Sequence, residues 1–278
     1  MTTLRPTTRA PGAHKSTVIA LHCSGSSGRA WDRLRQTLGD EVALIAPDLI
    51  GCGTTPHWLG PRPFRLTHEA AAIVALIDRQ DGPVHLVGHS YGGGVALRAA
   101  LERPRRVASL ALYEPTPFHV LGSIGADGRA ARQEIQEVAD DIAFHVAAGL
   151  PRRAARRFID YWNHAGAFDA LKPEVQADLL RYVPKASLDF EALLGERAPL
   201  AAYRRLRIPL LVLRGEHAPP PTALIARKLA AVMKATALVT VAGAGHMGPF
   251  SHAAIVNSAI AEHLGVNASG AHEVSRAA

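Results

Sequence analysis

Short apolar runs alternate with longer amphipathic segments along most of the chain. The short runs are continuously apolar and bounded by turn residues, which is typical of buried strands. They are Thr17–Leu21, Val42–Ala46, Val84–Gly88, Val107–Leu112, Pro209–Leu213 and Ala237–Val241. Between them lie the helical patterns Arg29–Leu38, Thr67–Asp78, Gly92–Glu102, Thr222–Met233 and Ala253–Leu264. This alternation predicts an α/β fold, with a mainly parallel twisted sheet of about six strands and helices on both faces.

One stretch, residues 117–207, interrupts this alternation and contains no convincing strand. Its helical segments are Arg129–Ala148, Pro151–Asn163, Pro173–Tyr182 and Leu188–Leu194. We expect an inserted all-α lid over one end of the sheet. The chain then divides into a first core part (1–116), a helical lid (117–207) and a second core part (208–278). The residues before Thr17 include Pro6 and Pro11 and are poorly patterned for strands.

Composition narrows the class of protein. The chain has 278 residues, of which 48% are hydrophobic, enough for a sizeable core. The net charge of +7 invites a nucleic-acid interpretation, but no recognised motif accompanies it, and we expect no such partner. Two cysteines exclude a disulfide framework, and no signal peptide or membrane span is evident. A cytoplasmic protein is therefore expected, and the pattern does not indicate an oligomeric state.

The strongest chemical signal is the segment Gly88–Gly92 (GHSYG), which follows a predicted strand and opens a predicted helix. A serine on such a tight turn stands clear of the sheet, and flanking glycines allow neighbouring backbone to approach. Ser90 is therefore the candidate nucleophile. The amide of Tyr91, at the helix N-terminus, is a candidate donor to an oxyanion.

At this point the sequence resembles the α/β-hydrolase fold family over nearly its whole length. Besides the Ser90 motif, the resemblance rests on three segments: Leu21–Gly25 (LHCSG), Ala46–Gly53 (APDLIGCG) and Gly243–Met247 (GAGHM). The resemblance implies that His246 is the general base and that the amide of Ser24 is the second oxyanion donor. Cys23 stands where the family usually has glycine. No histidine spacing is typical of a zinc site, and the reaction implied needs no metal or organic cofactor.

The third triad member departs from the family pattern, because its usual aspartate position is Ala218. Glu114 follows the strand after the nucleophile helix, where some members, haloalkane dehalogenases among them, carry their acid. Glu216 is the alternative, on the expected strand but two residues early. We favour Glu114 as the residue that orients His246, and a site without either carboxylate is also open.

The resemblance implies a serine hydrolase that cleaves a small-molecule ester or lactone through an acyl-enzyme. Carbon–carbon bond hydrolysis of diketo acids and cofactor-free perhydrolysis are alternatives, as is a related protein that binds a small ligand without turnover. Candidate lining residues are Phe118, Trp162 and Met247. The arginines of the run Arg152–Arg157 are expected to face solvent, although an arginine pair facing an acidic substrate is the other interpretation.

Overall fold

The strands of the computed structural model, which describes residues 16–266, follow the apolar runs of the sequence. They are β1 (Ser16–Leu21), β2 (Val42–Ile45), β3 (Val84–His89), β4 (Val107–Tyr113), β5 (Leu210–Gly215) and β6 (Ala237–Val241). Each end lies within two residues of its predicted position. Residues 1–15, in which no strand is expected, lie outside the described part of the chain.

The six strands form one parallel sheet in the order β2-β1-β3-β4-β5-β6. The register aligns their carboxyl ends: Leu21 pairs with Gly88, His89 with Tyr113, and Gly215 with Val241. Residues that directly follow these strands are therefore gathered at one edge of the sheet, where ligands bind in open α/β sheets.

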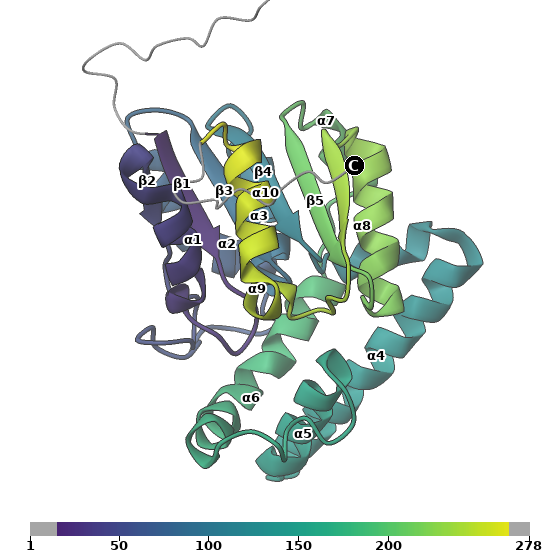
Figure 1. Cartoon of the computed structure of the whole chain (residues 1–278). Helices are drawn as coiled ribbons and strands as arrows, with labels where there is room; N and C mark the ends of the chain where they lie inside the picture. The colour runs from purple at the N-terminus through teal and green to yellow at the C-terminus, as the bar shows by residue number, and fades with distance from the viewer. Residues whose placement is uncertain (1–15, 267–278) are drawn as a thin grey trace, which may run out of the picture.

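Helices cover both faces of the sheet (Figure 1), as the sequence predicts. One face is covered by α1 (Asp32–Leu38) and α10 (Ala253–His263), and the other by α2 (Leu66–Asp78), α3 (Tyr91–Glu102) and α8 (Pro220–Met233). The apolar core has two parts accordingly. Along β1, Val18 and Ala20 belong to the first part and Ile19 and Leu21 to the second, as the two-residue period of a strand requires.

Between β4 and β5 every regular element among the described residues is helical. These elements are the 3₁₀ turn η3 (Phe118–Ser123) and the helices α4 (Gly125–Ala147), α5 (Pro151–Trp162), α6 (Pro173–Leu194) and α7 (Leu200–Arg205). Helices α4, α5 and α6 lie together beyond one end of the sheet (Figure 1). The limits of a separate lid at residues 117 and 207 stay a prediction.

Helix α6 differs from the sequence prediction of two segments, Pro173–Tyr182 and Leu188–Leu194. It is one continuous helix with Pro184 inside it. A proline inside a helix removes one backbone hydrogen bond. The buried face of α6, which includes Val183, Ala186 and Phe190, offsets that loss by packing on the core.

Several short elements were not expected from the sequence. They are the 3₁₀ turn η2 (Gly39–Glu41) and the helices α7 and α9 (Gly248–Ser251). The predicted helix Arg29–Leu38 begins with a 3₁₀ turn, η1 (Gly28–Trp31), and continues as α1. Helix α9 lies close to the proposed base, because it begins two residues after His246.

Candidate active site

Ser90 lies in the turn between β3 and α3 and has a positive φ of 54°, which is strained for a residue with a side chain. The glycines of the motif allow this turn. A Cβ at Gly92 would lie 2.3 Å from the carbonyl oxygen of Leu21, and one at Gly88 would lie 2.7 Å from that of Gly92. Neither position can carry a side chain without moving backbone, so the local sequence determines where Ser90 points.

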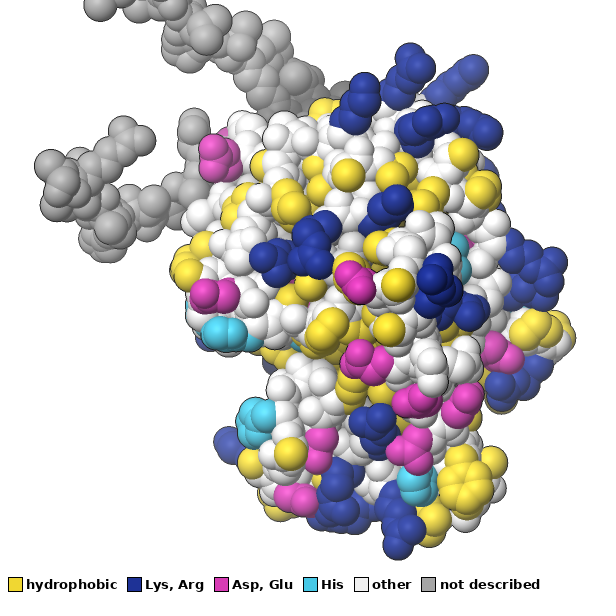
Figure 2. Space-filling model, turned by 90° about the vertical axis from the view of Figure 1, so that its right-hand side faces the viewer, with side chains coloured by type: hydrophobic (Ala, Val, Ile, Leu, Met, Phe, Trp, Pro, Cys, Tyr) yellow, Lys and Arg dark blue, Asp and Glu magenta, His cyan; other side chains and the backbone are white. Residues whose placement is uncertain are grey.

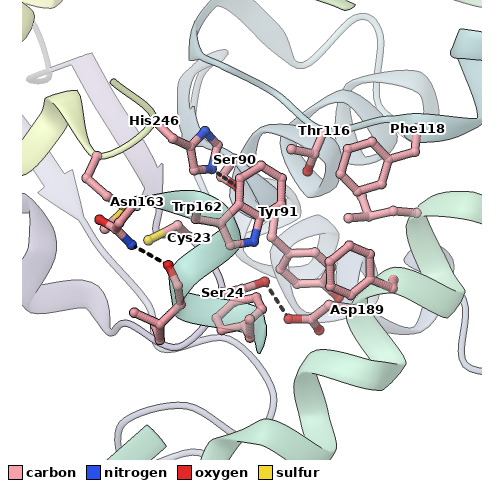
Figure 3. Close-up of a pocket in the computed structure, with 15 residues that line it drawn as sticks. Cys23, Ser24, Ser90, Tyr91, Thr116, Phe118, Trp162, Asn163, Asp189 and His246 are labelled. Atoms are coloured by element: carbon pink, nitrogen blue, oxygen red, sulfur yellow. Dashed lines mark hydrogen bonds between the residues drawn. The ribbon is translucent and has the colours of Figure 1, made fainter. Parts of the chain in front are cut away.

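Three residues that follow different strands form a hydrogen-bonded chain at the carboxyl edge of the sheet. Nε2 of His246 lies 2.9 Å from Oγ of Ser90 (Figure 3), and Nδ1 lies 2.7 Å from Oε2 of Glu114. All three side chains are buried, at 5% exposure or less. A carboxylate can only accept, so Nδ1 carries the imidazole hydrogen and Nε2 is free to accept the proton of Ser90.

The Glu114 carboxylate is held by three donors. Besides His246, the amide of Gly215 and the hydroxyl of Thr222 each donate to it, both at 2.8 Å. Burial alone would raise the pKa of Glu114, but these hydrogen bonds and the neighbouring imidazole hold that pKa below its usual value. Glu114 also has a positive φ of 39°. Sequence reasoning missed Thr222, which is 108 positions away along the chain.

Glu216, the alternative acid, lies elsewhere. Its side chain is exposed, and its Oε2 accepts a hydrogen bond from the amide of Gly243 at 2.8 Å. This bond shapes the turn that precedes the His246 loop. The structure thus brings Glu114, and not Glu216, against the imidazole of His246.

Two strand residues, His89 of β3 and Tyr113 of β4, hold the loop that carries His246. His89 Nε2 donates to the carbonyl oxygen of His246 at 2.9 Å, and the hydroxyl of Tyr113 donates to that of Gly245 at 2.8 Å. Burial lowers the pKa of His89 well below its usual value, so this imidazole stays neutral. His89 supports the loop and does not face Ser90.

The two candidate oxyanion donors, Ser24 and Tyr91, border the same pocket as Ser90 (Figure 3). Tyr91 occupies the first position of α3, where a backbone amide has no acceptor within the helix. Ser24 follows β1, and the preceding carbonyl of Cys23 accepts a 2.7 Å hydrogen bond from Nδ1 of His22, whose Nε2 accepts from the amide of Leu49 at 3.0 Å. Carbonyl and amide point to opposite sides of a trans peptide, so the Ser24 amide is turned away from His22.

A pocket with an empty volume of about 500 Å³, open mouth included, lies beside Ser90 (Figure 3). The expected lining residues Phe118, Trp162 and Met247 all border it. The indole of Trp162 stacks on the His246 imidazole with ring centroids 4.3 Å apart. Further lining residues, which were not expected there from the sequence, are Cys23, Thr116, Phe158, Ile159, Asn163, Asp189, Phe190 and Leu193. The pocket is predominantly apolar.

Cys23 is a second potential nucleophile in this pocket. Its thiol is free and buried, and burial raises its pKa to about 12. A thiol with such a pKa carries almost no thiolate at neutral pH, and thiolate is the reactive form. Ser90, which has a base within hydrogen-bond distance, is the better candidate.

The arginine run of α5 faces outward. Arg152 and Arg156 both pair with Asp169, and Arg157 pairs with Asp141, with about 40–60% of each side chain exposed. In Figure 2 basic and acidic side chains are interspersed over the inserted helices. The solvent-facing interpretation therefore holds for these arginines, and none of them borders the pocket beside Ser90.

Within residues 16–266, no three or more histidine, cysteine, aspartate or glutamate side chains are grouped so that they could hold a metal ion. In the same part of the chain, no helix is long and apolar enough to cross a membrane.

The parallel sheet and the candidate active site at its carboxyl edge define a protein of the α/β class, and comparison with known proteins gives its family. A family model described as the alpha/beta hydrolase family matches residues 18–259. The chain belongs to this family.

Three relatives illustrate the likeness. Lipase LipV of Mycobacterium tuberculosis is 39% identical over 119 residues, which are 42% of this chain and 41% of the lipase. A 2-hydroxy-6-oxo-2,4-heptadienoate hydrolase of Pseudomonas putida is 36% identical over 103 residues, 34% and 36% of the two chains. The structure of a thermophilic esterase from Thermogutta terrifontis superposes with a TM-score of 0.68 at 24% identity and covers 91% of each chain. The matches span less than half the length of the first two relatives.

Proposed function

We propose that this protein is a serine hydrolase that cleaves a carboxylic ester or lactone of a small molecule through an acyl-enzyme. The observation that carries the proposal is the continuous chain from Ser90 Oγ through His246 to Glu114, with distances of 2.9 and 2.7 Å. A nucleophile, a base and a group that orients the base are the three parts that this chemistry requires.

In the proposed reaction, His246 Nε2 takes the proton of Ser90 as Oγ attacks the substrate carbonyl. The amides of Ser24 and Tyr91 donate to the oxyanion of the tetrahedral intermediate, and Glu114 stabilises the imidazolium. Collapse of the intermediate expels the alcohol, which takes the proton from His246. Water, deprotonated by the same imidazole, then attacks the acyl-enzyme, and the acid and free Ser90 are released.

The pocket favours an uncharged, apolar acyl group. Aromatic and aliphatic side chains make up most of its wall, and Asp189 adds a carboxylate. Among the described residues that line it, none is lysine or arginine. A substrate that carries a carboxylate would find no cationic side chain on the pocket wall to pair with, and its desolvation would cost binding free energy.

Carbon–carbon bond hydrolysis of a diketo acid is the second candidate, and the 36% identity with the heptadienoate hydrolase favours it. Such substrates are anionic, so the lining of the pocket argues against them. Perhydrolysis would use the same three residues with peroxide in place of water. A non-catalytic binding role is weakened because Glu114 supplies the carboxylate that Ala218 lacks. The cytoplasmic location stays a prediction from the sequence.

The test combines active-site labelling with a substrate screen. Wild type and Ser258→Ala, an exposed serine on α10, should react with a fluorophosphonate, whereas Ser90→Ala should not. Neutral p-nitrophenyl esters and a δ-lactone should be turned over faster than a 2-hydroxy-6-oxo-dienoate, with Ser90→Ala as the blank. Folded wild type that resists labelling would contradict the proposed mechanism. Faster turnover of the dienoate would contradict the substrate class.

A further inference from the structure

A buried charged cluster lies beside the pocket and has no part in the proposed proton transfers. Lys185 and Asp189, one turn apart on α6, and Glu69 on α2 are each at most 3% exposed. Lys185 Nζ lies 3.0 Å from Oε2 of Glu69 and also contacts the carboxylate of Asp189. Burial alone would lower the pKa of Lys185, but the two carboxylates raise it to about 12, so the lysine is charged at neutral pH.

Each end of this cluster binds the side chain of a proposed oxyanion donor. The hydroxyl of Ser24 donates to Oδ2 of Asp189 at 2.6 Å (Figure 3), and the hydroxyl of Tyr91 donates to Oε2 of Glu69 at 2.8 Å. Ser24 and Tyr91 lie on separate elements, after β1 and at the start of α3. The cluster therefore links the two donors through hydrogen bonds and ion pairs that lie outside their own backbone.

The attachment at Ser24 lies close to the backbone amide of the same residue. Oγ of Ser24 is two bonds from the Cα atom of the same residue, and that Cα is bonded to the amide nitrogen. A hydroxyl held in place therefore restricts the direction of the Ser24 amide. Tyr182 also donates to Oδ2 of Asp189, which fixes the carboxylate from the other side. On the opposite end, Glu69 Oε1 accepts from the amide of Ile50 at 2.8 Å, which fixes Glu69 in turn.

The cost of burying these groups argues for a role other than stability. Moving ions out of water costs several kcal/mol each, and well-packed apolar residues of similar volume are often as stable. Fully satisfied polar clusters instead restrict the surrounding structure to one arrangement. In this protein the restricted groups are the two oxyanion donors.

We propose that Asp189 is a positioning residue, which holds the Ser24 amide in the orientation that binds the oxyanion. Lys185 and Glu69 extend this restraint to Tyr91, so that helix α6 sets the separation of the two donors. The inference rests on the proposed serine-hydrolase function. It assigns no proton transfer to Asp189, which acts only through Ser24.

Ser24→Ala is the decisive variant, because it removes the hydroxyl but keeps the backbone amide and the Lys185 ion pairs. Removing an oxyanion donor outright costs about 10²–10³ in kcat, so loosening one should cost roughly tenfold. We expect that loss in kcat for a neutral ester, with KM changed less than twofold, and an equal loss in the rate of fluorophosphonate labelling. Ser24→Thr, which keeps a hydroxyl, should recover most of the rate.

Ser27→Ala, in the same loop and without a side-chain capping hydrogen bond to η1, is the matched control and should behave as wild type. Melting temperatures of all variants separate a positioning effect from loss of fold. If Ser24→Ala is stable and retains wild-type kcat and labelling rate, the inference is wrong. If Ser90→Ala also retains activity, the proposed function itself is wrong, so the two failures are distinguishable.

Asp189→Asn tests the acceptor from the other side. It replaces the carboxylate that accepts from the Ser24 hydroxyl with a neutral amide oxygen, which is a weaker acceptor, and we expect a loss in kcat no larger than that of Ser24→Ala. The double variant Ser24→Ala/Asp189→Asn should then lose little more than Ser24→Ala alone, because both changes act on one interaction. Additive losses would contradict the route through Ser24.

Discussion

Two buried polar clusters flank Ser90, and they are built from different parts of the chain. The first, His246 and Glu114, is carried by loops that directly follow strands. The second, Glu69, Lys185 and Asp189, is carried by the helices α2 and α6. In the first cluster a carboxylate orients an imidazole that exchanges protons. In the second, a charged lysine joins two carboxylates, and the proposed task is to keep backbone donors in place.

The difference shows that burial of a carboxylate does not by itself assign its role. Glu114 and Asp189 are both buried, Glu114 against His246 and Asp189 in the wall of the pocket. Glu114 contacts the imidazole, whereas Asp189 contacts a lysine and two hydroxyls. Their substitution should therefore affect different quantities.

Replacing Glu114 should have the largest effect on catalysis. In Glu114→Gln the amide cannot stabilise an imidazolium, and its NH₂ group can force the wrong tautomer on His246. We expect kcat for a neutral ester to fall by about 10³- to 10⁴-fold. Glu216→Gln, the matched control on the exposed carboxylate, should stay within twofold of wild type in the same steady-state assay. The reverse result would transfer the role of Glu114 to Glu216.

Replacing Lys185 should have the largest effect on stability. Lys185→Met leaves Glu69 and Asp189 buried without their cation, and breaking a buried pair in this way costs about 3–5 kcal/mol. The free energy of unfolding, measured by urea titration, should fall by that amount. Arg156→Met removes an exposed ion-pair partner of Asp169. Surface ion pairs contribute little to the free energy of unfolding, so the urea midpoint of this variant should match that of wild type. Equal stability of the two variants would mean that the cluster on α6 is not desolvated in solution.

The sequence predicted the strand-end cluster better than the helical one, for a physical reason. A serine between glycines directly after an apolar strand is typical of a catalytic nucleophile. Glu114 and His246 each follow a predicted strand, which places them at the same edge of the sheet. Lys185 and Asp189 are four residues apart, the spacing of an ordinary surface ion pair on a helix. Nothing local to α6 indicates that this pair is buried, since the residues that cover it come from elsewhere in the chain.

Pro184 made α6 harder to predict, because a proline in a helical sequence pattern normally indicates that the helix ends there. In the structure the helix continues through Pro184, since its buried face packs on the core. The sheet was easier, since six continuous apolar runs leave little choice of strand. Contacts such as Thr222 to Glu114 join residues more than a hundred positions apart and depend on the whole fold. They were accordingly absent from the sequence prediction.

The smallest expected effect concerns His89, which carries no charge and supports the His246 loop of the first cluster. Burial lowers its pKa well below 6.5 in the folded protein, whereas the unfolded chain binds the proton near pH 6.5. Below that pH the unfolded state therefore binds more protons, and the folded state loses stability as pH falls, by at most about 1.4 kcal/mol per pH unit from this group.

The variant His89→Gln, whose amide can still donate to the His246 carbonyl, should lose less stability than wild type between pH 7.5 and 5.5. Urea titrations at both pH values measure the difference, and His164→Gln, at an exposed position, should keep the wild-type pH dependence. If His89→Gln keeps it too, the buried imidazole of His89 is not held neutral in the folded protein.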